Sequence, residues 1–176
     1  MIPTDEEAMW AVGSGDLDQA GLLFDRYHVG LYHFFHRMIQ DRELSKDLTQ
    51  NVFVRLLRYR GSYQPGQPFR AWIYRVARNV ANDHFEKQKS SFVGLKPIHE
   101  RVAAPDGAEQ AEQVVTLQLA LQQLPQSDRD LLVMSRYQEL KYEEIAQIMG
   151  LSLSAVKVRV HRAIKKLKEL YFKHEN

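Results

Sequence analysis

The chain has 176 residues, of which 44% are hydrophobic and 26% charged, and its formal net charge at pH 7 is +2. These values are typical of a globular protein of one or two small domains, and no apolar run approaches the length of a membrane span. The first ten residues lack the basic and then apolar order of a secretory signal, so we expect an intracellular, cytoplasmic protein. The absence of cysteine excludes disulfides and cysteine-ligated zinc and says little by itself about the compartment.

Three helices are predicted in the first half of the chain. In each of them apolar residues recur every three or four positions, which is the spacing of an amphipathic helix with one buried face. The first is expected over Asp16–Gln40, with Asp16 as its N-cap. The second is expected over about Arg42–Arg60 and the third from Phe69 onward. The stripe of the second helix consists of Leu48, Val52, Leu56 and Tyr59. Three such stripes can close one hydrophobic core.

The second helix also has a mixed polar face opposite its stripe. This face is made of Asp47, Gln50, Asn51, Val54 and Arg58. An outward-facing valine among polar residues suggests a protein partner. A face that is simply solvated fits the same spacing equally well, so spacing alone leaves both interpretations open.

The third helix carries cations and amides on the side away from its apolar stripe. These residues are Arg75, Arg78, Asn79 and Asn82, with Trp72 at the border. Arginine holds phosphate, amides read base edges and an aromatic ring stacks on an unpaired base, so the face suits single-stranded nucleic acid. The loop from Ser62 to Phe69 is long enough to form the rim of a pocket beside it. The alternative is that Trp72 belongs to the core and that Arg75 or Asp83 pairs within the fold.

Helical periodicity is lost between about Gln88 and Gln113, where prolines, glycines and finally acidic residues accumulate. This composition indicates a linker. We therefore expect a first domain over residues 1–87, a linker over 88–112 and a second domain over 113–176.

The second domain is predicted to be a four-helix unit that ends in a helix-turn-helix. Helical spacing resumes at Val114, is interrupted at Pro125 and then restarts. Tyr142–Lys168 is predicted to form two helices around a tight turn, in which Gly150 takes a positive φ and Ser152 caps the second helix. No strand pattern or internal repeat competes, so the expected fold is all-α.

The last predicted helix has an apolar stripe and an opposite basic face. The stripe consists of Leu153, Val156, Val160, Ile164, Leu167 and Tyr171. The exposed face is centred on Ser154, Val158, His161 and Lys165 and is flanked by Lys157 and Arg162. Between Ser152 and Lys168 there are six Lys or Arg and no acidic residue. A like-charged face repels itself, so we expect an anionic partner, and the second helix of such a motif is the one that enters a DNA major groove. A solvated basic helix inside a helical bundle is the alternative.

The sequence contains no recognisable catalytic constellation. It lacks a glycine-rich phosphate loop, a cysteine nucleophile and a glycine-flanked serine of the hydrolase type. His28, His33 and His36 lie near one another in sequence, but no carboxylate pattern beside them completes a metal site, so we expect them to pack among aromatic residues. No catalytic residue, cofactor or metal is therefore predicted.

Four segments of the chain, in this order, match one known family: FDRYHVGLYHFFHRMIQD, DLTQNVFVRLLRYRGSYQ, PFRAWIYRVARNVANDHFEK and the stretch from Leu124 to Leu170. The chain resembles an extracytoplasmic-function (group 4) sigma factor of bacterial RNA polymerase, of the sigma-70 family, over nearly its full length. The first two segments are similar to the start of the family's region 2 and to its polymerase-binding helix. The third is similar to the segment that melts and reads the minus-ten promoter element, and the fourth to region 4, which reads the minus-thirty-five element.

The resemblance implies a role for each of the predicted faces. It implies that Asp47, Gln50 and Asn51, with Val54 beside them, meet the β′ coiled-coil of core RNA polymerase, and that region 4 meets the β flap. It implies that the face of the third helix and its preceding loop hold a single strand and accept an everted base. The duplex contacts that it assigns fall on Ser154, Ala155, Lys157, Val158, His161 and Arg162, close to the set obtained from helix geometry, which also includes Lys165.

The function expected from this resemblance is that of a dissociable initiation factor. Such a protein directs core polymerase to specific promoter DNA, has no catalysis of its own and binds DNA weakly when free. The family often has an anti-sigma partner that occludes both domains, so one is expected here. Two alternatives stay open: a stand-alone helix-turn-helix regulator whose first domain senses a ligand or dimerises, and a helical protein-interaction module.

Overall fold

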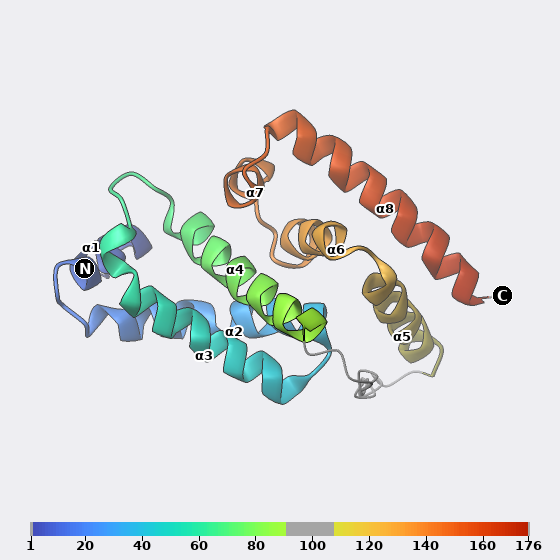
Figure 1. Ribbon diagram of the computed structural model, residues 1–176, viewed down its shortest axis with the longest axis horizontal. Helices are drawn as coiled ribbons and strands as arrows, with labels where there is room; N and C mark the ends of the chain where they lie inside the picture. Colours follow the sequence, from blue (N-terminus) through green and yellow to red (C-terminus); the bar gives the residue numbers. More distant parts are fainter. Residues whose placement is uncertain (1, 91–107, 176) are drawn as a thin grey trace.

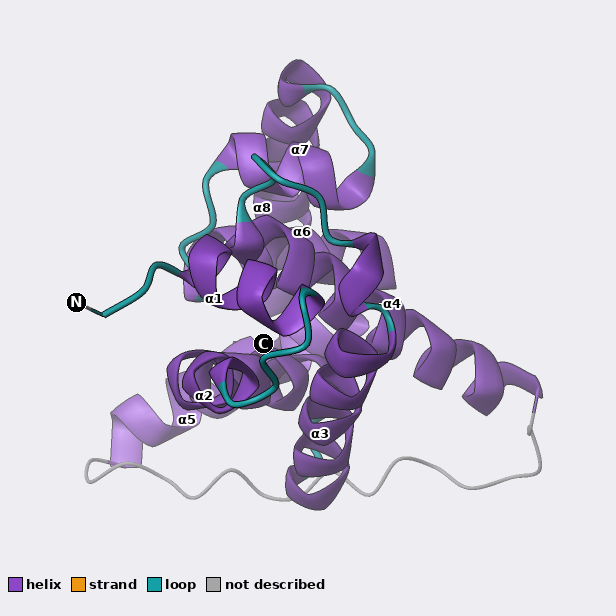
Figure 2. Cartoon of the chain, turned by 90° about the vertical axis from the view of Figure 1, so that its left-hand side faces the viewer, coloured by secondary structure: helices purple, strands orange, loops and turns teal. Residues whose placement is uncertain are grey.

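The computed structural model describes residues 2–90 and 108–175, and these residues form eight α-helices joined by turns and loops (Figure 1). No strand occurs among the described residues, as the colouring by secondary structure in Figure 2 also shows. The predicted all-α fold is confirmed. None of the helices within these two ranges combines the length and the hydrophobicity that crossing a bilayer requires.

The first domain is built from four helices. They are α1 (Asp5–Gly13), α2 (Gln19–Ile39), α3 (Arg42–Arg58) and α4 (Phe69–Ser90), with a short 3-10 turn, η1 (Arg60–Ser62), after α3. Their inner faces form one hydrophobic core. Its side chains, none of them more than 2% exposed, include Leu31, Phe34, Phe35, Met38, Val52, Leu56, Ile73 and Ala77. The predicted start of α3 is confirmed, because the Asp41 carboxylate accepts a hydrogen bond from the backbone N–H of Leu44 over 2.9 Å.

Helix α1 is absent from the sequence-based prediction, although a local signal marks it. Thr4 and Glu7 form a capping box, in which each side chain accepts a hydrogen bond from the other residue's backbone N–H. The predicted cap of α2 was wrong: the helix begins at Gln19, and Asp16 lies in the turn before it. The backbone N–H groups of residues 14–17 donate hydrogen bonds to preceding carbonyls and so form a separate turn. Helix α2 therefore begins one turn later than the periodicity of apolar residues predicts.

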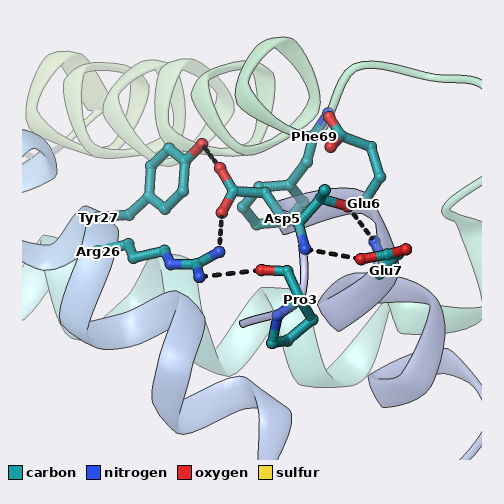
Figure 3. A network of polar contacts seen from close by, with 8 residues as sticks. Pro3, Asp5, Glu6, Glu7, Arg26, Tyr27 and Phe69 are labelled. Carbon is teal, nitrogen blue, oxygen red and sulfur yellow. Dashed lines mark hydrogen bonds and ion pairs between the residues drawn. The ribbon is translucent and has the colours of Figure 1, made fainter. Parts of the chain in front are cut away.

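Helix α1 is tied to α2 and α4 by its acidic first turn (Figure 3). Asp5 accepts from the Arg26 guanidinium and from the Tyr27 hydroxyl, each over 2.5 Å. Glu6 accepts from the backbone N–H of Phe69 over 3.0 Å, which satisfies one of the free donors at the start of α4. Burial and the neighbouring Asp5 carboxylate raise the pKa of Tyr27. The first turn of α1 therefore joins α2 to the N-terminal turn of α4.

The second domain contains the predicted four helices. They are α5 (Ala108–Gln123), α6 (Gln126–Leu132), which continues into one π turn, η2 (Val133–Tyr137), α7 (Tyr142–Met149) and α8 (Leu153–Glu175). Helix α8 packs on α5, α6 and α7, and the apolar side chains between them include the fully buried Leu121, Leu131, Ile145 and Val156. Helix α4 extends to Ser90 and α5 begins at Ala108, so the middle of the predicted linker, residues 91–107, lies outside the described residues.

The two domains pack against each other. Helix α4 lies against α7, and α2 lies against η2 and the C-terminal part of α5. The Arg37 guanidinium sits 3.8 Å from the ring centre of Tyr137, a cation–π contact across this boundary. Gly30 allows a close approach, because a Cβ on it would lie 3.1 Å from the Tyr74 hydroxyl, which donates to Gln138 over 2.6 Å. The chain is therefore closed, with α4 facing the second domain.

Candidate nucleic-acid and polymerase-binding surfaces

The helix-turn-helix has the local geometry that its sequence predicts. Helix α7 ends at Gly150, whose φ of 65° lies in the left-handed region, and the chain then turns with Leu151 N–H bonded to the Ala146 carbonyl over 3.0 Å. The Ser152 hydroxyl accepts from the backbone N–H of Ala155 over 3.1 Å and so caps α8. The predicted turn and both caps are confirmed.

The exposed face of α8 carries the residues predicted for duplex DNA. Ser154, Lys157, Val158, His161, Arg162 and Lys165 are exposed, and Ala155 is half-buried. Val156, Val160 and Ala163, on the opposite side, are at most 2% exposed. Because the apolar stripe fixes the rotation of α8, the cations project away from the core. Val158 is 48% exposed on this face, where its side chain can make an apolar contact with a base edge.

A second candidate surface is an open pocket of about 680 Å³ between α4 and the loop that precedes it. It is lined by Tyr59, Ser62, Gln64, Pro65, Gly66, Gln67, Trp72, Arg75, Val76 and Asn79. This volume is enough for a nucleobase with part of its backbone. The expectation that this loop forms the rim of a pocket is confirmed, and Arg75 and Asn79 come together on its wall.

Tyr59 is a candidate residue whose position differs from the prediction. Helical spacing predicts it on the buried stripe of the second helix, but α3 ends at Arg58 and the Tyr59 side chain is 50% exposed at the pocket. Its φ of −104° and ψ of 15° show that it has left the helix, so helical spacing no longer predicts its orientation. An exposed aromatic ring beside a polar pocket is a stacking platform for an unpaired base. The glycine two residues later was the available signal that the helix ends here.

Trp72 lies deeper than the border position expected for it. The side chain is 6% exposed, and its ring packs edge-on against Tyr63 at 5.6 Å and beside Phe69 at 6.0 Å between ring centres. Trp72 therefore forms the floor of the pocket, and only its edge is available to a ligand. Burial raises the pKa of the neighbouring Tyr63 to about 12, so that phenol stays neutral and donates to the Gln67 carbonyl over 2.5 Å, which closes the loop.

Three of the four polar residues predicted on α4 contact the second domain. Arg75 donates to the carbonyl of Gln147 over 2.8 Å, and Arg78 forms an ion pair with Asp130 over 3.0 Å. Asn82 accepts from the side-chain amide of Gln126 over 2.7 Å. Asn79 is exposed.

Asp130 is the most electrostatically unusual group on this boundary. Its side chain is 1% exposed, and one of its carboxylate oxygens has no hydrogen-bond partner. Burial raises the pKa of Asp130 to about 6, and the attraction to Arg78 offsets part of that rise. At neutral pH the carboxylate is therefore ionised in a setting that partly disfavours its charge, so the ion pair adds little net stability.

The predicted polymerase-binding residues lie together on the outer side of α3. Asp47, Gln50 and Asn51 are exposed, and Val54 is 53% exposed. The side-chain oxygen of Asn51 accepts from Arg55 over 3.0 Å, and Arg55 also pairs with Asp83 of α4 over 2.6 Å. The possibility that Asp83 pairs within the fold is thus realised. The face has an apolar centre and a polar rim, the pattern of a protein-binding patch.

The clustered histidines pack among aromatic residues, as predicted. His28 stacks on Phe24 with 4.7 Å between ring centres, and His36 stacks on Tyr32 at 5.7 Å. Within the described ranges, no group of three or more His, Asp or Glu side chains is placed to hold a metal ion.

Comparison with known proteins identifies the family. The family model for sigma-70 region 2 matches residues 23–91, and that for sigma-70 region 4 matches residues 115–167. The chain is 34% identical to the RNA polymerase sigma factor CarQ of Myxococcus xanthus over 152 residues, which cover 84% of this chain and 86% of CarQ. It is 30% identical to the extracytoplasmic-function sigma factor SigE of Mycolicibacterium smegmatis over 187 residues, which cover 99% of this chain and 72% of SigE.

Solved structures show the same fold. CnrH in its complex with the cytosolic domain of CnrY superposes with a TM-score of 0.74 at 23% identity, covering 94% of this chain and 96% of CnrH. RpoE of Bartonella quintana in its complex with the anti-sigma factor NepR gives a TM-score of 0.65 at 23% identity, covering 88% and 96%. With both family regions present in order on this fold, the chain belongs to the sigma-70 family and is an extracytoplasmic-function sigma factor of bacterial RNA polymerase, a transcription initiation factor.

Proposed function

We propose that the two candidate surfaces hold the two promoter elements. The exposed face of α8 reads the minus-thirty-five duplex through Ser154, Ala155, Lys157, Val158, His161, Arg162 and Lys165. The α4 face, with Arg75, Arg78, Asn79, Asn82 and Trp72, holds the minus-ten single strand, and Tyr59 adds a stacking surface. The observation that carries this proposal is the pocket of about 680 Å³ that unites an exposed aromatic ring, a guanidinium and an amide beside α4.

The domain division follows the same assignment. Region 2 spans residues 1–87, a linker spans 88–112 and region 4 spans 113–176, with α4 continuing to Ser90 and α5 beginning at Ala108 inside these linker bounds. The two promoter elements are then read by different domains on one tether. Melting requires no bond chemistry from this chain, because an everted base held in the pocket offsets its lost pairing and stacking. We propose that the chain is no enzyme and needs no cofactor or metal. It works in the cytoplasm, where core polymerase transcribes.

The protein partners follow from the remaining surfaces. The α3 face around Val54 binds the β′ coiled-coil of core polymerase, and region 4 binds the β flap. An anti-sigma factor is a further partner, supported by CnrH and RpoE, whose solved structures contain CnrY and NepR. A stand-alone regulator is the weaker alternative, because it leaves the exposed Val54 face without a function.

Transcription from a promoter library with reconstituted holoenzyme tests the proposal. The wild-type chain should direct core polymerase to specific start sites. Tyr59→Ala should lower the yield of open complexes about tenfold, the cost of one lost stacking contact, while Tyr59→Phe should retain most of it. Permanganate reactivity of unpaired thymines reports the open complex directly. Unchanged start-site selection with and without the chain, or tight two-fold symmetric duplex binding without polymerase, would favour the stand-alone regulator instead.

A further inference from the structure

We propose that a second unpaired base of the promoter strand stacks on Trp10, in a hollow separate from the pocket beside α4, an inference that rests on the proposed function of that first pocket. The hollow has a volume of about 180 Å³ and lies where α1 packs against the turn η1. It shares no lining residue with the first pocket. Its lining includes Met9, Trp10, Gly13, Arg60, Gly61 and Tyr63.

Trp10 is the exposed aromatic residue of this hollow. Its side chain is 55% exposed, whereas Met9 and Tyr63, which also line the hollow, are 0% and 6% exposed. The two buried side chains give the hollow an apolar floor, and the indole stands beside it in contact with solvent. An aromatic ring in this setting is a stacking platform for a planar ligand, and every nucleobase presents a flat face to it.

The size and the charge of the hollow indicate the class of ligand. Its volume lies below the roughly 300–1,000 Å³ of drug-sized ligand sites and suits one flat ring. Arg60 is exposed; its guanidinium donates to the Leu57 carbonyl over 2.6 Å, and its other N–H groups can meet a phosphate. The acidic side chains of α1 lie in its first turn, where caps and ion pairs engage them (Figure 3). A stacking ring and a cation together fit one nucleotide.

The two sites lie on neighbouring parts of one loop. Tyr59 lines the first pocket and Arg60, the next residue, lines the second hollow, so the backbone of this one turn separates them. Tyr63 of the second hollow packs edge-on against Trp72, the floor of the first pocket, with 5.6 Å between ring centres. One buried aromatic pair therefore supports both sites. A strand that places a base in the first pocket and crosses η1 meets Trp10.

Two glycines leave the hollow free of side chains. A Cβ on Gly13 would have one neighbour within 4 Å, the carbonyl oxygen of Arg60 at 3.5 Å, and a Cβ on Gly61 would have none. A larger side chain at Gly61 is therefore compatible with the fold and takes up space beside Trp10. Gly61→Leu reduces the room for a ligand and leaves the indole unchanged.

The experiment uses reconstituted holoenzyme and a promoter that the wild-type chain selects from the library. Single abasic sites are placed in turn along the non-template strand, each removing one base and keeping the backbone, and permanganate reactivity of the remaining thymines reports the open complex. Trp10→Ala should lower the yield about tenfold on the intact promoter, and Trp10→Tyr should retain most of it. At one position an abasic site should cost the wild type about tenfold and cost Trp10→Ala nothing further, which identifies the stacked base. Exchanging the four bases at that position should change the yield less than about threefold, because stacking accepts every base.

Leu17→Ala is the matched control, because Leu17 is 52% exposed in the turn after α1 and does not line the hollow; it should match the wild type. Gly61→Leu should reproduce the effect of Trp10→Ala, and circular dichroism at 222 nm checks that each variant is folded. An unchanged yield in both variants, or the same loss from Trp10→Ala at every abasic position, overturns the inference. Tyr59→Ala should cancel the effect of an abasic site at a different position. Absence of that pairing would refute the proposed function of the first pocket, whereas its presence without a pairing for Trp10 would refute the second site alone.

Discussion

Arg129 gives the sharpest prediction for the stability of this fold. It lies in the middle of α6 and is 9% exposed. Its guanidinium donates to the carbonyls of Leu121, Gln122 and Leu124 at the end of α5, over 2.6 to 3.2 Å, and to the Met38 carbonyl of α2 over 2.9 Å. One buried side chain thus caps the last turn of α5 and links the two domains.

Replacing Arg129 by Met keeps most of the side-chain volume and removes every donor. Of these four carbonyls, that of Leu121 retains a partner in the backbone N–H of Leu124 at 3.3 Å, and Gln122 is only half-buried. Two carbonyls, those of Met38 and Leu124, therefore stay buried and unpaired. At about 1–3 kcal/mol each, this predicts a loss of about 4 kcal/mol in the free energy of unfolding. Burial disfavours the charged guanidinium and lowers the pKa of Arg129. The variant has no such desolvation cost, so its loss in the free energy of unfolding stays below the sum of all the lost hydrogen bonds.

Urea unfolding followed by circular dichroism at 222 nm measures this loss. Arg136→Met is the matched control, because Arg136 is exposed on the neighbouring turn and should cost less than about 0.5 kcal/mol. Arg129→Lys should fall between the two, since an ammonium keeps the charge but cannot reach several carbonyls at once. A loss below about 1 kcal/mol for Arg129→Met would refute the view that these carbonyls depend on Arg129.

Three further predictions concern charge and partner binding. Because burial raises the pKa of Asp130 from 3.8 to about 6, its contribution to stability is complete below pH 3.8 and is lost as the pH rises through 6. Between pH 4 and pH 7 the free energy of unfolding of the wild type should therefore fall by up to about 3 kcal/mol relative to that of Asp130→Asn. A difference between the two proteins in urea unfolding that does not change with pH would contradict this. Arg162→Ala should weaken promoter-duplex binding by holoenzyme and reduce the slope of log affinity against log salt by about 0.9, while Lys173→Ala, near the end of α8, serves as the control. Val54→Asp should weaken binding to core polymerase at least about tenfold. Val29→Asp is the control, because Val29 is 52% exposed and Val54 is 53% exposed, and it should leave binding unchanged. Equal effects of the two variants in a pull-down titration would argue against the α3 face as the polymerase-binding surface.

Local sequence predicted most of the helices and the rotation of the recognition helix. The stripe at Val156 and Val160 fixes which side of α8 is buried, so the basic side follows without knowledge of any other helix. Gly150 and Ser152 similarly predict the turn, because a positive φ and an N-cap hydrogen bond are properties of one or two residues. The capping box at Thr4 is an equally local signal and marks the start of α1, which the periodicity of apolar residues does not reveal.

Other features depend on pairs of residues that lie far apart in the sequence. The tether of α1 to α4 joins Glu6 to Phe69, 63 positions away, and the ion pair between Arg78 and Asp130 spans 52 positions. Helical spacing places Arg78 on an outer face but says nothing of the domain that packs there.

The sequence by itself determined the family, the all-α fold and the side of each helix that faces outward, because helical periodicity and caps act over a few residues. The tertiary structure decided that Tyr59 borders a pocket, that Trp72 is its floor and that the α4 face meets the second domain. These depend on how whole helices pack, since burial is set by neighbours that no local pattern specifies.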